Sequence, residues 1–174
     1  MAMTKVYHQS LAADVHLGDF DEALLRRHSL TIDNMMRPST NKPVPNTIVL
    51  TGLAPGPFRV VLWAIKQDKG DALKIIVHDL PLLKVVLVSN AVEYLQIAPA
   101  QAQIDGHICW YIANHPLTVD EVIAVHQEFE ARQATSKVWR VLVHQVAWDI
   151  CHMKYSEADK DTLDRVTRQS HRSL

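Results

Sequence analysis

Six short apolar runs in the middle of the chain constrain its fold more than any other feature. Each run is rich in valine and isoleucine and is separated from the next by residues typical of turns. Short connections predict antiparallel pairing, because parallel neighbours need crossovers of a dozen residues or more. A helix over 82–96 is not favoured, because the face that begins at Leu82 would also carry Glu93. The runs are TIVLTG (47–52), FRVVLWAIK (58–66), ALKIIVH (72–78), LKVVLVS (83–89), VEYLQIA (92–98) and GHICWYIA (106–113).

Helical periodicity replaces these runs in the last third of the chain. Residues 118–132 begin with the capping-box sequence TVDE, and residues 136–153 form a second helical stretch. A short helix over 20–28 precedes the apolar runs. Strands followed by helices predict an α+β fold, with a mainly antiparallel sheet of about five or six short strands (47–113) packed against the C-terminal helices.

The length of 174 residues suits one domain, which we take as 1–174. Three prolines forbid regular structure over much of residues 31–46, so we expect a connector or arm there. A capping pair, Ser156 with Asp159, resembles a further helix start. The apolar content after it is thin, and we expect 155–174 to be a weakly structured tail.

The charge balance excludes binding to nucleic acid or an anionic membrane through a global field. The chain has 18 basic and 19 acidic residues, a formal net charge of −1, although a local basic patch is still compatible. Cys109 and Cys151 are the only cysteines and form no C-x-x-C pair, so we expect no disulfide framework and a cytoplasmic setting. No apolar run resembles a signal peptide or a membrane-spanning helix.

The helix over 136–153 has two apolar sides. One is a continuous stripe with spacings of 4, 3, 4 and 3, which predicts a core face. The other is a semi-apolar stripe that we interpret as a partner interface, because a helix that is apolar on two sides is either central or covered by a partner. The core stripe is Trp139, Val143, Val146, Ile150 and Met153, and the interface stripe is Val141, His144, Trp148, Cys151 and His152.

The histidines of this helix do not form a metal site by themselves. His144 and His152 are eight residues apart, which places them about 12 Å apart along the axis, too far to share one ion. No cysteine pair offers an alternative, so we expect neither a bound metal nor a cofactor.

Other chemically suggestive residues also have a structural interpretation. His126 and Glu130 are four apart, but the pattern lacks the H-E-x-x-H of zinc hydrolases, and His126 falls on an apolar stripe. Cys109 with His107 or His115 is a conceivable thiol–imidazole pair, without the surrounding signature of a cysteine hydrolase. The glycines of TGLAPGPF match no phosphate-binding motif.

The sequence favours a small soluble interaction, assembly or regulatory protein that binds a protein partner or itself, with a homodimer as the expected form. One alternative is a histidine-dependent hydrolase or transferase that uses Cys109, Glu130 or Asp149. A second is a nucleic-acid-binding accessory protein that uses the arm at 31–46 and the C-terminal arginines. Each function predicts a different surface feature. A binding protein predicts an exposed apolar patch, an enzyme predicts a pocket with convergent histidines, and a nucleic-acid-binding protein predicts a positive stripe. The arginines are Arg165, Arg168 and Arg172.

Overall fold

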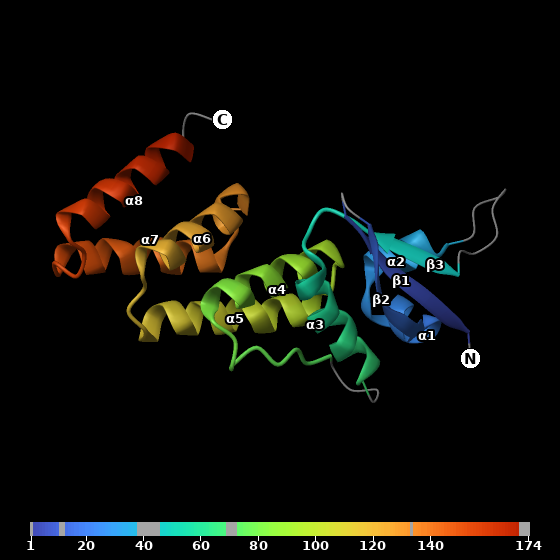
Figure 1. The fold of residues 1–174 in the computed structure, drawn as a ribbon. Helices are drawn as coiled ribbons and strands as arrows, with labels where there is room; N and C mark the ends of the chain where they lie inside the picture. The colour runs from blue at the N-terminus through green and yellow to red at the C-terminus, as the bar shows by residue number, and fades with distance from the viewer. Residues whose placement is uncertain (1, 11–12, 38–45, 69–72, 133, 171–174) are drawn as a thin grey trace. The chain divides into compact units, whose positions relative to one another are not determined.

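A computed structural model describes residues 2–10, 13–37, 46–68, 73–132 and 134–170, with side chains to residue 165. Short strands near the N-terminus are followed by a long series of helices (Figure 1). In chain order the elements are β1 (Met3–Gln9), β2 (Asp14–Asp21), α1 (Glu22–His28), α2 (Leu30–Met35), β3 (Thr47–Leu50), α3 (Pro55–Lys66), α4 (Leu82–Tyr94), α5 (Ala98–Asn114), α6 (Val119–Phe129), the 3₁₀ turn η1 (Glu130–Arg132), α7 (Lys137–Cys151) and α8 (Glu157–Ser170).

The chain groups into two compact units, which are described separately. The first consists of Met1–Leu80 and Leu87–Ile104, and the second of Pro81–Val86 and Asp105–Leu174. Helices α4 and α5 therefore each contribute residues to both units. The assignment of 1–174 to a single domain stays a prediction.

The first unit contains a mixed sheet built mainly from the N-terminus. Strand β1 is central; it pairs antiparallel with β2 and parallel with β3. The sequence MTKVYHQ alternates as a half-buried strand should, because Thr4, Val6 and His8 are buried and the residues between them are more exposed. This hairpin was not predicted from the sequence.

The prediction of five or six antiparallel strands over 47–113 is wrong. Of the six runs, only the first contains a strand in the described residues, and that strand, β3, is parallel to its neighbour. The second run lies in helix α3. Its buried residues Phe58, Val61, Leu62 and Ile65 have the i, i+3, i+4, i+7 spacing of a helix, which the β-branched composition concealed.

Helices α4 and α5 replace the last three predicted strands. Helix α4 is buried over much of its circumference, so no polar face marks its period. Its Ser89 is fully buried and accepts a hydrogen bond from Gln101 Nε2 at 2.8 Å. In α5, Ile104, Ile108 and Ile112 are four residues apart and all fully buried. That spacing was the helical signal in a run read as a strand.

The third predicted strand, over 72–78, is irregular where it is described. Leu73, Ile75 and Val77 are buried in alternation with more exposed neighbours, as in a strand. Its backbone is instead paired by a side chain: Ile75 N–H donates to Gln103 Oε1 at 3.4 Å, and Gln103 Nε2 donates to the Ile75 carbonyl at 3.1 Å. The alternating apolar pattern therefore comes from a half-buried segment that lies outside the sheet and is not a β-strand.

The predicted helices over 20–28, 118–132 and 136–153 are confirmed as α1, α6 with η1, and α7. The capping box at the start of α6 is formed, and in the second unit α6 packs against both α7 and α8. Helix α8 occupies much of the region expected to be a tail, and Ser156 and Asp159 cap it reciprocally. Helix α2 lies at the start of the expected arm, whose residues 38–45 lie outside the described part of the chain.

Candidate functional site

Helix α7 turns a different face to the core from the one its apolar stripe predicts. Its buried residues are Val138, Leu142 and Asp149. Val143 is 50% exposed and Met153 is 84% exposed, so the predicted core stripe is wrong. The reason is chemical: the true buried face includes a carboxylate, and a pattern built on hydrophobicity assigns a carboxylate to solvent.

The residues predicted as an interface lie on the exposed side of this helix. His144, Trp148, Cys151 and His152 are exposed and Val141 is half-buried, while the interface role itself stays a prediction. Together with the misassigned stripe they form one continuous area, called the α7 surface below. It consists of Val141, Val143, His144, Ala147, Trp148, Ile150, Cys151, His152 and Met153.

A Schellman motif ends α7 and turns the chain back over the helix. Met153 N–H donates to the Ile150 carbonyl at 3.1 Å and Lys154 N–H donates to the Asp149 carbonyl at 3.0 Å. Met153 has a φ of 55°, in the left-handed region where glycine is favoured. The reversal places Lys154 beside residues one turn earlier in the helix.

The Lys154 side chain is held from two directions. Its Nζ donates to Asp149 Oδ1 at 2.9 Å and lies 4.3 Å from the centre of the Trp148 ring. The Asp149 carboxylate is buried and also accepts from Gln145 Nε2 at 3.1 Å. The Trp148 ring is fixed in turn by stacking on His152, with centroids 3.8 Å apart. These contacts order a surface lysine that would otherwise sample many rotamers.

A pocket of about 550 Å³ lies between the end of α5 and this part of α7, and is called the α5–α7 pocket below. His115 forms one wall; its ring stacks on Tyr111 with centroids 4.4 Å apart and meets Trp110 edge-on at 5.2 Å. Of its lining residues in the described part of the chain, only Lys154 carries a permanent charge. The lining residues are Ala113, Asn114, His115, Pro116, His144, Gln145, Trp148 and Lys154.

The α5–α7 pocket therefore brings together two predicted interface residues, one histidine of the enzyme alternative and one residue that sequence reasoning missed. His144 and Trp148 were identified from the helix pattern, and His115 as a conceivable partner of Cys109. Lys154 was missed, because it lies just beyond the end of α7 and reaches the pocket through a change of chain direction. The signal for Lys154 was its position five residues after the single acidic residue of α7.

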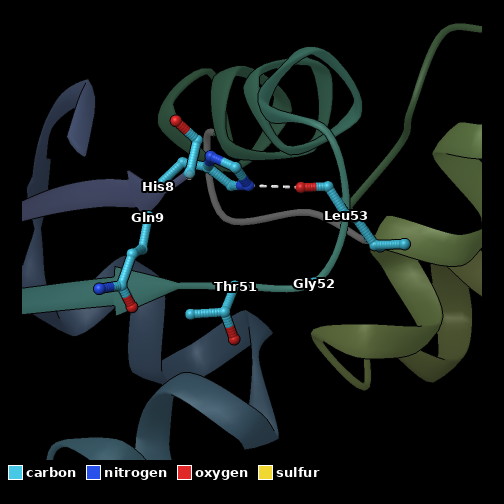
Figure 2. Close-up of a pocket in the computed structure, with 6 residues that line it drawn as sticks. His8, Gln9, Thr51, Gly52 and Leu53 are labelled. Carbon is cyan, nitrogen blue, oxygen red and sulfur yellow. Dashed lines mark hydrogen bonds between the residues drawn. The ribbon is translucent and has the colours of Figure 1, made fainter. Parts of the chain in front are cut away.

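A second hollow, of about 430 Å³, lies in the first unit at the carboxyl ends of β1 and β3. His8 reaches from the end of β1 toward the loop after β3 and donates through Nε2 to the Leu53 carbonyl (Figure 2). His8 is only 4% exposed, and its Nδ1 has no hydrogen-bond partner among the described residues. Gly52, with a φ of 90°, is required for the turn beneath it.

The helix that follows this hollow is poorly equipped to bind an anion. Helix α3 has Ala54 as its N-cap, without a side-chain hydrogen bond. Pro55 and Pro57 have no N–H, so two of the backbone donors at its first turn are missing. The hollow is therefore lined by polar groups without a preformed phosphate cradle.

Two residues of the enzyme alternative, Cys109 and Asp149, are buried in the structure. Cys109 is buried, and burial raises the pKa of its thiol, with a smaller opposing effect from Lys137, so the reactive thiolate is disfavoured. Asp149 is engaged by Lys154 and Gln145. Within the described residues, no group of three or more histidine, cysteine, aspartate or glutamate side chains could hold a metal ion.

The residues of the nucleic-acid alternative are described only in part. In α8, Arg165 donates to the Asp161 carbonyl and to Thr162 Oγ1, each at 3.2 Å. The side chain of Arg168 and all of Arg172 lie outside the described residues.

Comparisons with known proteins give no information on function. No family model, curated protein or solved structure matches this chain. As for membranes, none of the helices in the described part of the chain has both the length and the apolar character needed to cross one.

Proposed function

We propose that this protein is a small interaction or assembly protein that associates through the α7 surface, with a second copy of the chain as its partner. The observation that carries this proposal is that exposed charge flanks that surface, with Lys137 and Arg140 before it and Lys154 after it, but does not interrupt it. Between Val141 and Met153 the sequence contains one charged residue, Asp149, and it is buried and paired. A solvated helix face normally carries several charges over such a length.

An uncharged surface favours self-association in particular. In a two-fold interface the same patch is present on both sides, so any charge near the axis faces its own copy and is repelled. On the α7 surface the central positions are instead occupied by Val143, Ala147 and Trp148. These side chains can pack against themselves without leaving a buried unpaired charge.

Met153 adds an exposed apolar side chain to the same surface. Its left-handed backbone is explained by the Schellman motif that ends α7, as at many helix ends. Its side chain is 84% exposed and so gains little burial within the chain. Contact with a partner would bury it.

The test is the mass of the protein in solution by light scattering or sedimentation equilibrium at tens of micromolar. We expect a dimer for the wild type and a monomer for Trp148→Glu, which places a charge in the middle of the α7 surface. The matched control is Trp63→Glu, because Trp63 is an exposed tryptophan on α3 in the other unit. A monomeric wild type, or dissociation by Trp63→Glu alone, would refute association through α7.

The two free cysteines support a reducing compartment, such as the cytoplasm, as the location that goes with this function. Both cysteines are free, and Cys151 is exposed on the α7 surface. An exposed free thiol at an interface is prone to oxidation and cross-linking outside such a compartment. Covalent dimers formed through Cys151 on mild oxidation of the purified protein would fit both the location and the interface.

A further inference from the structure

The chemistry of the α5–α7 pocket, which shares His144 and Trp148 with the surface proposed for association, points to a ligand of its own. We propose that this pocket binds a carboxylate carried on an aromatic or branched aliphatic body, such as a small arylalkanoic acid. The proposal does not require the chain to self-associate. It rests on the charge of Lys154, on the fixed conformation of that lysine and on the apolar lining of the pocket.

The charge of the lining selects an anion. Lys154 supplies a permanent positive charge, and the carboxylate that contacts it among the described residues, Asp149, is buried. An ammonium group has three donors, and one is used by Asp149 Oδ1, so donors are left for a ligand on the half-exposed outer side. Hydrogen bonds between charged partners are the stronger kind, which favours a carboxylate over a neutral amide or alcohol.

The order of the lysine makes this charge effective. A free surface lysine loses much rotamer entropy when a ligand fixes it, and this loss weakens binding. Here the Asp149 carboxylate and the Trp148 ring already hold the side chain. The pocket is therefore preorganised for the anionic group.

The walls select the body of the ligand. Ala113, Pro116 and Trp148 offer apolar surface, and the ring of His115 is held in place by Tyr111. Asn114 Nδ2 donates to the Trp110 carbonyl at 2.8 Å, so this amide is held by the helix end. A volume of about 550 Å³ lies within the range of small-molecule sites.

The experiment titrates the wild-type protein with 3-phenylpropionate and, separately, with 3-phenylpropionamide, which has the same shape without the charge. Binding is followed by shifts of the backbone amide signals of Ala113 and His115 and of the Trp148 indole signal. We expect the acid to bind about tenfold or more tightly than the amide, as loss of one charge-assisted hydrogen bond implies. Equal affinities, or no shifts with either compound at millimolar concentration, would overturn the proposal.

A variant assigns the effect to the lysine. Lys154→Met alone would leave the buried Asp149 carboxylate unpaired, so the test uses Lys154→Met together with Asp149→Asn. This double variant should lose the preference for the acid, whereas Lys160→Met, a lysine of α8 that does not line the pocket, should keep it. If the double variant is unfolded, the acid-against-amide comparison on the wild type still decides.

The outcome is separable from the proposal of self-association. Light scattering of the same samples reports the oligomeric state with and without each probe. A wild type that is monomeric but prefers the acid would refute the dimer and keep the pocket. A dimer that binds the acid and the amide equally would support self-association and refute the proposed carboxylate site.

Discussion

A pair of valine substitutions in α7 tests which face of this helix is in the core. Val138 is fully buried and Val143 is 50% exposed, and they lie on the same helix five positions apart. The apolar stripe in the sequence makes the opposite assignment, with Val143 in the core and Val138 outside it. Replacing each valine by alanine therefore compares the two assignments with identical chemistry.

The expected magnitudes follow from burial. Val138→Ala removes apolar groups worth about 1.6 kcal/mol, at about 0.8 kcal/mol for each buried carbon, and leaves a cavity that adds to this loss. The higher helix propensity of alanine returns about 0.5 kcal/mol, so we expect a net loss of about 1.5–2.5 kcal/mol. For Val143→Ala about half of the transfer loss remains, and the same propensity gain brings the net change to within about 0.5 kcal/mol of zero.

The assay is urea unfolding followed by far-ultraviolet circular dichroism and by tryptophan fluorescence, since two of the four tryptophans, Trp139 and Trp148, lie in α7. Both probes are needed because the chain forms two compact units that need not unfold together. In a thermal scan the loss at Val138 corresponds to a fall in Tm of about 3–10 °C, at 2–4 °C for each kcal/mol. A larger loss for Val143→Ala than for Val138→Ala would refute the buried face seen in the structure.

Three further changes have definite expected outcomes. Met153→Gly should raise the free energy of unfolding, measured in urea, by about 1 kcal/mol, because glycine adopts the left-handed C′ position without strain. The same change should weaken association, because it removes an apolar side chain from the α7 surface. A loss of stability would contradict the Schellman cap. Burial, reinforced by Asp149, raises the pKa of Tyr155 to about 12 from the ordinary 10, so stability that is complete below pH 10 should be lost as pH rises toward 12. Unfolding free energies at pH 9 and pH 11 test this, and in Tyr155→Phe the fall should be smaller. Thr118→Ala should cost about 1 kcal/mol in unfolding free energy, because it removes the capping box formed with Glu121, and an unchanged stability would show that the cap contributes nothing.

The helices with explicit end signals could be predicted from the sequence. Thr118 and Ser136 each accept a hydrogen bond from the backbone at the start of the helix that they precede. Such capping is local chemistry, so it is visible in a single sequence without knowledge of the packing. In the last third of the chain these capping residues were enough to predict which segments are helical and roughly where each helix begins and ends.

The middle of the chain could not be predicted in this way, because burial on several sides removes the polar face that marks a helical period. Helix α4 has apolar residues around most of its circumference, and short valine-rich runs then resemble strands. The N-terminal hairpin was not predicted for a different reason. Its alternating residues are polar as often as apolar, and Thr4 and His8 are buried although their side chains are polar.

The site shows the same limitation at the level of one residue. Asp149 lies on the buried face of α7, and Lys154, beyond the helix end, pairs with it. Without that pair a buried carboxylate would be costly. The pairing lets a carboxylate share the buried face with Val138 and Leu142, and it holds a lysine at the edge of the α5–α7 pocket. Removing the lysine alone would leave the carboxylate without its charged partner, so Asp149 and Lys154 must be replaced together when the pocket is tested.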